Sequence, residues 1–186
     1  MALYAGWGGL SKVFIYGGGG APWARSANTD LRDLLTNEEM ESARASVLNA
    51  HFTAPEICRR IWRTVESLGF SGGAVLEPSA GVGNFLGTMP ESLVPHCSIT
   101  AIEKDDLTGR MLRAIYPDAK VRIGGFEESG DLKGTQDLVI SNVPFGNYNV
   151  YDPEYHGKNM SIHNYFAVKA LDCLKPGGIA AIVTSR

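Results

Sequence analysis

The sequence contains few cysteines and no paired ones. Its 186 residues include only Cys58, Cys97 and Cys173, which are widely spaced and form no C-x-x-C motif. We therefore expect neither a disulfide framework nor a zinc site, and this cysteine usage is typical of a reducing, cytoplasmic compartment. The four histidines also lack the spacing of metal ligands, so we predict no metal site.

Long hydrophobic runs and an excess of basic charge are absent as well. No apolar stretch approaches the roughly 18 residues of a membrane-spanning helix, and no basic region follows Met1 as in a secretory signal. We therefore predict no membrane association. With 17 basic and 20 acidic side chains the net charge is −3, whereas a chain that grips a long stretch of DNA by itself is usually basic.

Glycine, in contrast, is abundant, with 22 residues. Residues 1–35 are predicted to be an irregular, glycine-rich lead-in. The four consecutive glycines from Gly17 to Gly20 favour a flexible linker. A phosphate-binding loop would require a preceding strand and a following G-K-[ST], and neither is present.

Residues 36–70 are predicted to form two N-terminal helices. Thr36 with Glu39, and Thr53 with Glu56, each have the spacing of a capping box at a helix start. The first helix is expected to run to about residue 49. An apolar stripe indicates the buried face of the second helix: Ile57, Ile61, Val65 and Leu68.

Residues 71–186 alternate between strand and helix patterns and are predicted to be one domain. Alternation of this kind indicates an α/β fold with a doubly wound, mostly parallel sheet, which binds ligands at the carboxyl ends of its strands. The expected strands are 74–76, 98–102, 120–123, 137–141 and 179–184, and the clearest helix is 162–174.

A glycine turn follows the first expected strand, after Glu77. Gly81 and Gly83 allow the backbone to approach a ligand, and we expect a helix to begin just beyond them. Leu86 stands where the dinucleotide fingerprint has its third glycine. Glu103 ends the next strand about twenty residues later, where a carboxylate can accept hydrogen bonds from ribose hydroxyls. Together these features favour a nucleoside ligand over a plain turn and a surface acid.

The fourth strand ends in the turn S-N-V-P-F-G. Pro144 stiffens this turn and favours an extended conformation at Val143. The Asn142 amide oxygen and the Val143 carbonyl are two acceptors beside the flat ring of Phe145, an arrangement that suits the amino group of a planar base. The alternative is a strand-ending turn in which the asparagine caps the backbone and the aromatic ring packs in the core.

Three motifs, H-F-T-A-P-E, V-L-E-P-S-A-G-V-G-N-F-L and I-S-N-V-P-F-G, carry a resemblance to a known family. From about residue 51 to 186 the chain resembles the S-adenosylmethionine-dependent DNA adenine-N6 methyltransferases. It is most similar to the methylase portion of the methyltransferase–helicase proteins of phages and conjugative elements. The resemblance implies a Rossmann-like sheet of order 3-2-1-4-5, S-adenosylmethionine as cofactor, and methylation of adenine N6 in DNA, as in restriction-modification.

The resemblance also implies roles for individual residues. Glu103 would hold the ribose hydroxyls of the cofactor, Thr53 its methionine carboxylate, and Phe126 would lie beside its adenine. Glu77, Gly81 and Gly83 would line its methionine and ribose region. The catalytic N-P-P-[FYW] turn corresponds to Asn142, Val143, Pro144 and Phe145.

Two positions depart from the family's pattern. Val143 replaces the first proline of the turn, but the role expected there uses a backbone carbonyl, which valine retains. Gly125 stands where an acidic residue often reads the adenine amino group, a contact for which Glu127 is the substitute.

The family's catalytic domain continues with an antiparallel hairpin and a target-recognition region, whereas this sequence stops at its fifth expected strand. We therefore expect a C-terminally truncated chain, or a subunit completed by a target-recognition partner or a helicase region. Three tyrosines after the turn, Tyr148, Tyr151 and Tyr155, either line a DNA channel or order their own loop. The alternative functions are methylation of protein glutamine amides or RNA guanine amino groups, or a non-catalytic remnant.

Overall fold

A computed structural model describes residues 7–14, 21–47, 52–145, 149–155, 157 and 160–184. The predictions for Gly17–Gly20 and Tyr148 lie outside these residues. No helix in the described ranges is long and apolar enough to cross a membrane. The helices are α1 (Ser11–Phe14), α2 (Pro22–Leu34), α3 (Asn37–Ser46), α4 (Pro55–Ser67), α5 (Asp106–Ile115) and α6 (Ile162–Cys173). The strands are β1 (Gly73–Glu77), β2 (Cys97–Glu103), β3 (Lys120–Ile123), β4 (Gln136–Asn142) and β5 (Leu174–Val183).

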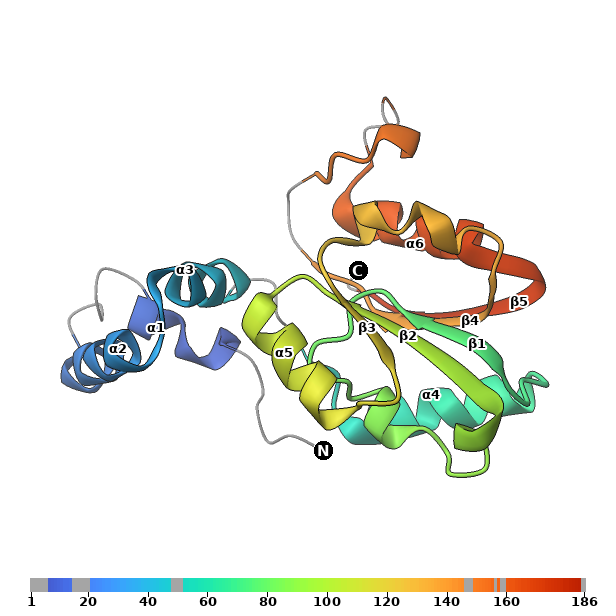
Figure 1. Ribbon diagram of the computed structural model, residues 1–186, viewed down its shortest axis with the longest axis horizontal. Coiled ribbons are helices and arrows are strands. Elements are labelled where there is room, and N and C mark those ends of the chain that lie inside the picture. Colours follow the sequence, from blue (N-terminus) through green and yellow to red (C-terminus); the bar gives the residue numbers. More distant parts are fainter. Residues whose placement is uncertain are drawn as a thin grey trace.

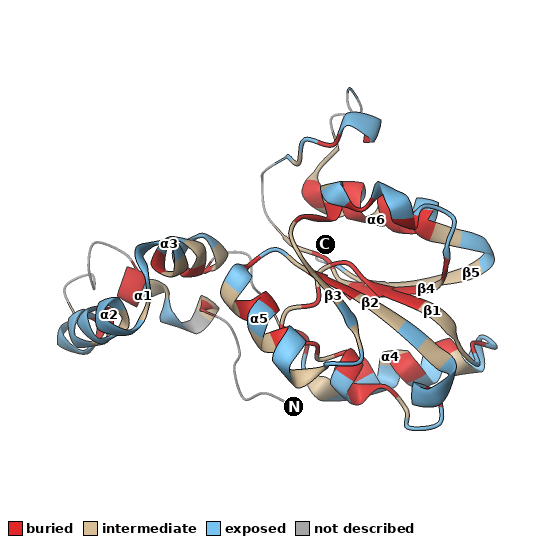
Figure 2. Cartoon of the chain, viewed as in Figure 1, coloured by how far each residue is buried: buried red, intermediate tan, exposed pale blue. Residues whose placement is uncertain are grey.

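The five strands form one parallel sheet of order β3-β2-β1-β4-β5, which confirms the predicted order (Figure 1). Helices α4 and α5 cover one face of the sheet and α6 covers the other. Successive side chains of β4 alternate accordingly: Leu138 packs with α4 and Val139 with α6. The central strands are therefore buried on both sides, whereas the helices keep an exposed outer surface (Figure 2).

Strand β5 begins earlier than predicted. The segment Lys175-Pro-Gly-Gly178, which precedes the expected strand 179–184, is part of β5, and the pairing of β5 with β4 is irregular there. The Asp137 carboxylate lies at this irregularity and accepts hydrogen bonds from Lys175 Nζ and from the backbone N–H of Ala74, each at 2.7 Å. These contacts join the starts of β1 and β5 to β4.

The lead-in predicted to be irregular contains ordered helices, which corrects that prediction. Helix α2 occupies Pro22–Leu34, with its proline at the first helical position. The helix was missed because most of its inward side chains are alanines or an asparagine, which give little hydrophobic periodicity. Together α1, α2 and α3 share a small core: Trp7, Val13, Phe14, Ala24, Met40, Ala43 and Val47.

The two predicted capping boxes have different outcomes. At α3 the capping box is confirmed, since the Glu39 N–H donates to Thr36 Oγ1 at 3.2 Å and the Thr36 N–H donates to Glu39 Oε2 at 2.9 Å. At α4 it is wrong, because Ala54 is the N-cap and no side chain caps the helix. Thr53 precedes the N-cap residue and lines the cavity described below.

The buried face of α4 also differs from the predicted stripe. Ile57 and Leu68 are 50% and 65% exposed, whereas Cys58, Trp62 and Val65 are buried. The indole of Trp62 covers more apolar area than an isoleucine, and its Nε1–H donates to the Phe85 carbonyl at 2.9 Å. The helix is therefore rotated toward its tryptophan.

The helix expected directly after the glycine turn is absent from this part of the described chain. Residues 81–85 form turns, and only a short 3-10 helix follows at Leu86–Thr88. The glycine turn is therefore held in place by contacts other than those of a long helix following it.

Candidate active site

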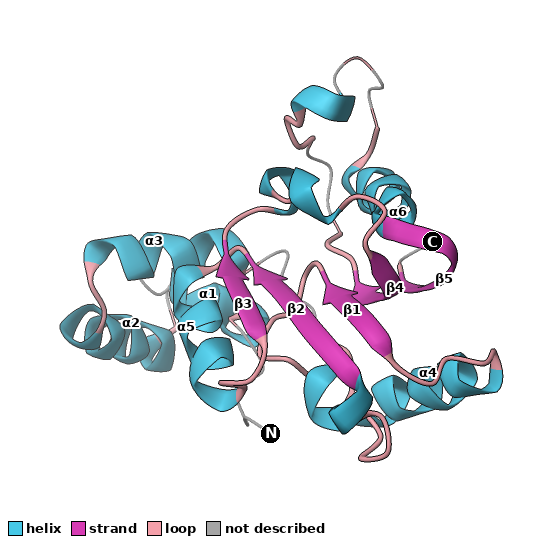
Figure 3. Cartoon of the chain, turned by 45° about the vertical axis from the view of Figure 1, so that its right-hand side comes forward, coloured by secondary structure: helices cyan, strands magenta, loops and turns pink. Residues whose placement is uncertain are grey.

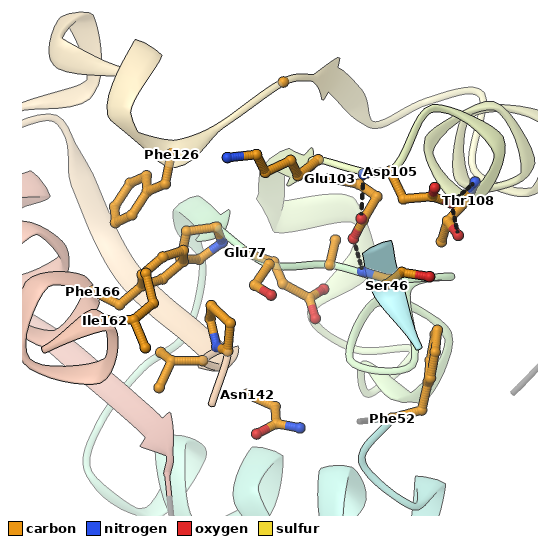
Figure 4. Close-up of a pocket in the computed structure, with 18 of the residues that line it drawn as sticks. Ser46, Phe52, Glu77, Glu103, Asp105, Thr108, Phe126, Asn142, Ile162 and Phe166 are labelled. Carbon is orange, nitrogen blue, oxygen red and sulfur yellow. Dashed lines mark hydrogen bonds between the residues drawn. The ribbon is translucent and has the colours of Figure 1, made fainter. Parts of the chain in front are cut away.

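A cavity of about 430 Å³ opens at the carboxyl ends of β1, β2 and β4 (Figure 4). Figure 3 shows the ends of β1, β2 and β3 at one edge of the sheet, which is where doubly wound folds bind ligands. The volume lies in the usual range for small-molecule pockets, roughly 300–1,000 Å³. Eight of the ten predicted site residues line it: Thr53, Glu77, Gly81, Glu103, Phe126, Asn142, Val143 and Pro144.

Glu103, the last residue of β2, is held by hydrogen bonds to both carboxylate oxygens. The Gly81 N–H donates to Oε2 at 2.7 Å and the Asp105 N–H donates to Oε1 at 2.8 Å. Burial raises the pKa of Glu103, and the two N–H groups oppose this shift by stabilising the carboxylate. The acid is therefore fixed in orientation beside the glycine turn.

Glu77, the last residue of β1, is a buried carboxyl group with an unsatisfied oxygen. Its side chain is 2% exposed, and Oε2 has no hydrogen-bond partner among the residues that the structure describes. Burial and, secondarily, the negative charge of Glu103 raise the pKa of Glu77 well above its ordinary value. Burying such a group without a partner is costly, and perturbed acids of this kind cluster at functional sites.

Thr53 contributes a second unsatisfied oxygen to the cavity. Its Oγ1 is buried and has no hydrogen-bond partner within the described ranges. Its carbonyl accepts a hydrogen bond from Asn84 Nδ2 at 2.9 Å, which connects the start of α4 to the glycine turn. The Glu77 and Thr53 oxygens are thus both buried without hydrogen-bond partners on residues that line the same cavity, which indicates that a polar group of a ligand can bind there.

The two glycines of the turn have different roles. Gly81 has φ +57° and lines the cavity, and a Cβ there would lie 2.7 Å from the ring of Phe52. Gly83 has φ +81° but does not line the cavity. A Cβ at Gly83 would lie 2.5 Å from the ring of Tyr116, whose hydroxyl donates to the Gly83 carbonyl at 3.0 Å. Gly83 thus permits close packing of α5 rather than direct contact with the cavity.

An apolar wall faces these polar groups. Phe126 is buried, with its ring centroid 5.1 Å from that of Phe166, and Ile162 lies beside them in the cavity wall (Figure 4). Lys169 Nζ lies 5.1 Å from the centroid of the Phe126 ring. Our reading of the sequence missed Ile162 and Phe166, because their helical spacing indicated only a core-facing stripe.

The turn after β4 forms a third part of the wall. The Val143 N–H donates to the Val183 carbonyl at 3.1 Å, so pairing with β5 extends into the turn. Asn142 and Pro144 are half-buried, as is Phe145, which does not line the cavity. Because the strand order is β2-β1-β4, Glu77 stands between Glu103 and Asn142 (Figure 4).

Residues from the N-terminal segment also line the cavity, and no sequence motif indicated them. Helix α3 contributes Ser42, Ala45 and Ser46, and Trp7 precedes the short helices that pack on α3. Lys104 and Glu127 also line the cavity, and they form an ion pair with each other at 3.2 Å.

The cysteines do not line the cavity. Burial raises the pKa of Cys58 to about 12 and that of Cys173 to about 11, which makes both poor nucleophiles. Among the described residues no group of three His, Cys, Asp or Glu side chains is arranged to hold a metal ion. His51 and His156 are outside those residues.

Comparison with solved structures identifies the fold. A proposed class I S-adenosylmethionine-dependent methyltransferase from Listeria monocytogenes superimposes with a TM-score of 0.58 at 14% identity, covering 95% of this chain and 64% of the other. The chain has the fold of the S-adenosylmethionine-dependent methyltransferases. A modification subunit of a proposed type I restriction enzyme from Vibrio vulnificus shares this methyltransferase fold, with a TM-score of 0.57 at 21% identity over 85% of this chain and 37% of the other.

No family model matches the sequence. Among curated proteins, the defense against restriction protein B of Escherichia phage P1 is 30% identical over 157 residues. That match covers 82% of this chain but only 7% of the phage protein, so the chain spans a small part of that relative's length.

Proposed function

We propose that this chain binds S-adenosylmethionine and methylates the exocyclic N6 of adenine in DNA. The observation that carries the proposal is a single cavity in which the acid at the end of β2 and the glycine turn meet the Asn142–Pro144 turn of β4. The acid that we assign to the nucleoside and the two acceptors that we assign to an amino group thus line the same cavity. Such proximity is what transfer between a cofactor and a base requires.

The residues of the cavity fit the cofactor. The Glu103 carboxylate, held by two N–H groups, retains lone pairs that accept hydrogen bonds from ribose hydroxyls. The unsatisfied Glu77 oxygen suits the ammonium group of a methionine moiety, and the Thr53 hydroxyl suits its carboxylate. Phe126 offers an apolar surface for adenine, and Glu127 at the rim is an acceptor for the adenine amino group. When bound, S-adenosylmethionine supplies an electrophilic methyl group.

The turn residues orient the target amino group. The Asn142 amide oxygen and the Val143 carbonyl would accept its two hydrogens and free the nitrogen lone pair to form the new N–C bond. The S–C bond to the transferred methyl group would break at the same time, so that S-adenosylhomocysteine leaves, and one amino proton would pass to solvent. Catalysis then comes from positioning and electrostatic complementarity rather than from a strong base. The target base must first leave the duplex, at a cost of a few kcal/mol. Phe145, which does not line the cavity, is the residue of this turn that we propose stacks on the flipped base.

Two relatives support DNA as the substrate. The phage P1 protein is named for defense against restriction, and the Vibrio vulnificus chain is a modification subunit of a proposed restriction enzyme. The net charge of −3 implies that further DNA contacts come from a target-recognition or helicase region, on a partner or elsewhere in a longer protein. Tyr151 is largely exposed, and among the three tyrosines after the turn we propose it as a contact to nucleic acid.

The cofactor half of the proposal is tested by calorimetric titration with S-adenosylmethionine and S-adenosylhomocysteine. We expect saturable one-to-one binding by the wild-type chain and its loss in Glu103→Ala. A folded wild-type chain that binds neither compound would contradict the proposal. Binding without turnover on any substrate would support the non-catalytic alternative.

The transfer half is tested by incubating the chain with labelled S-adenosylmethionine and DNA, followed by digestion and mass spectrometry for N6-methyladenine. Asn142→Ala is expected to lower transfer by about 100-fold or more, because it removes a group that acts mainly in the transition state. Its affinity for S-adenosylhomocysteine should remain within about twofold of wild type. Retained transfer in this variant, or methylation of RNA or of glutamine peptides with DNA untouched, would contradict the assignment.

A further inference from the structure

Helix α3 is connected to the cofactor-binding acid by a chain of hydrogen bonds. The Ser42 hydroxyl on α3 donates to Asp105 Oδ1. The Asp105 N–H in turn donates to Glu103 Oε1, and the Gly81 N–H holds the second oxygen of the same carboxylate. Residues from three separate segments of the chain therefore belong to one series of hydrogen bonds around Glu103.

Asp105 is the middle of this chain and its own position is tightly determined. The residue is buried, and its Oδ2 accepts from the Thr108 N–H at 2.8 Å and from the Thr108 hydroxyl at 2.5 Å. Asp105 thus caps the start of α5 with one oxygen and receives Ser42 on the other. Without the Ser42 hydroxyl, a buried carboxylate oxygen loses its hydrogen bond, and the segment that holds Glu103 loses a constraint.

The same helix supplies part of the cavity wall. Ser42, Ala45 and Ser46 of α3 line the cavity next to Glu103 and the glycine turn. An ion pair between Arg110 of α5 and Glu39, in the first turn of α3, connects the two helices. Helix α3 therefore has both a surface toward the ligand and a hydrogen-bonded path to its binding acid.

We propose that α3 belongs to the cofactor site and that Ser42 is a positioning residue for Glu103, acting through Asp105. This inference rests on the proposed function, since it assigns Glu103 to the cofactor ribose. The N-terminal helices then contribute to cofactor affinity, in addition to packing on α5.

A double-mutant cycle on the full chain tests this inference, with the dissociation constant for S-adenosylhomocysteine as the readout. Ser42→Ala is expected to weaken binding about fivefold, the effect of one hydrogen bond. Glu103→Gln should weaken it further, and in that background Ser42→Ala should have little additional effect. Ser42→Thr, which keeps a hydroxyl at the position, should restore affinity. A purely structural role would leave the two effects additive.

Two controls separate this role from general docking of the helix. Ser67→Ala removes a hydroxyl that donates only to the Thr64 carbonyl of its own helix, and it should leave affinity unchanged. Arg110→Gln weakens the ion pair with α3 without touching the chain to Glu103, so its effect should persist in the Glu103→Gln background.

The outcomes distinguish this inference from the proposed function. If wild type binds S-adenosylhomocysteine and Ser42→Ala binds equally well, Ser42 has no positioning role and only this inference is overturned. The same holds if the Ser42→Ala effect is undiminished in the Glu103→Gln background. Failure of the folded wild-type chain to bind would overturn both.

Discussion

At the scale of single residues, Glu77 brings an ionisable group into the interior at a cost to the unliganded fold. Its pKa is raised in the folded chain by burial and by Glu103. Above the ordinary pKa of a glutamate, the unfolded chain therefore releases a proton that the folded chain still holds. Unfolding becomes more favourable as the pH rises through this interval, so the contribution of Glu77 to stability falls with rising pH.

We expect Glu77→Gln to unfold at higher denaturant concentration than wild type at pH 8, by on the order of 1–3 kcal/mol in the free energy of unfolding. The variant should also show a flatter dependence of stability on pH between 5 and 8. Denaturation at several pH values measures both effects, with the exposed Glu91→Gln as control. Parallel pH curves for wild type and Glu77→Gln would contradict the expectation. Cofactor affinity should decrease in the same variant, because it loses the carboxylate that we propose binds the cofactor ammonium group.

Gly83 allows a second test at this scale. Its positive φ and its contact with Tyr116 leave no room for a side chain, so Gly83→Ala should lower the free energy of unfolding by about 1–3 kcal/mol. Gly130 has no positive φ and no atom within 4 Å of a Cβ, so Gly130→Ala is the matched control and should differ little from wild type. Equal stabilities of the two variants would show that the turn adapts.

At the scale of elements, a buried ion pair holds the segment after the Asn142–Phe145 turn against α6. Lys169 Nζ and the Tyr165 hydroxyl both donate to Asp152 Oδ2, at 2.7 and 2.6 Å, and both charged side chains are almost fully buried. Hydrogen bonding from these groups lowers the pKa of Asp152 although burial acts to raise it. The segment that follows the Asn142–Phe145 turn is thus fixed to the helix that carries Phe166.

Removing one partner should be strongly destabilising. Lys169→Met leaves the Asp152 carboxylate buried without its cation and is expected to cost about 3–5 kcal/mol, whereas the Lys169→Met/Asp152→Asn pair should recover part of this loss. Arg60→Met, which breaks an exposed pair with Glu56, should cost less than about 1 kcal/mol. Urea denaturation of the four proteins measures this, and a small effect of Lys169→Met would argue that water reaches the pair.

The sequence predicted the elements of the sheet well and the faces of the helices less well. Strand β3 has the predicted bounds, and β1, β2 and β4 extend the predictions by one or two residues, because short apolar runs between turn residues are a local signal. The orientation of α4 depends on which side chain fills the core best, and in the structure Trp62 is buried whereas Ile57 is exposed. The capping pattern at Thr53 was wrong because Ala54 occupies the N-cap position, whereas Thr53 precedes it and lines the cavity.

The site was predicted where its residues lie on strand ends and missed where they come from packing. Glu103 and Asn142 are the last residues of β2 and β4, so the strand pattern was enough to bring them to the same end of the sheet. Ser42 and Ser46 reach the cavity only because α3 packs against α5, a contact between segments distant in sequence. No local pattern encodes such a contact.

At the scale of the whole molecule, the cavity joins the N-terminal helices to the sheet, so a ligand should stabilise both. S-adenosylhomocysteine at 100 times its dissociation constant should add about 2.7 kcal/mol to stability and raise Tm by several degrees. Hydrogen exchange should slow in α3 as well as at the ends of β1 and β2, whereas α2, which does not line the cavity, is the internal control. Protection confined to the sheet would contradict a role for α3 in binding.

The strand order also bears on how the molecule is made. Strands β1, β2 and β3 pair with their neighbours in sequence, but β1 meets β4 only after the whole intervening half has been synthesised. Glu77, Glu103 and the glycine turn therefore emerge from the ribosome before the Asn142 turn. A nascent chain can assemble the acid-lined half of its cavity first and acquires the amino-group acceptors last. On the proposed assignment, the residues for the nucleoside are therefore synthesised before the turn that would act on nucleic acid.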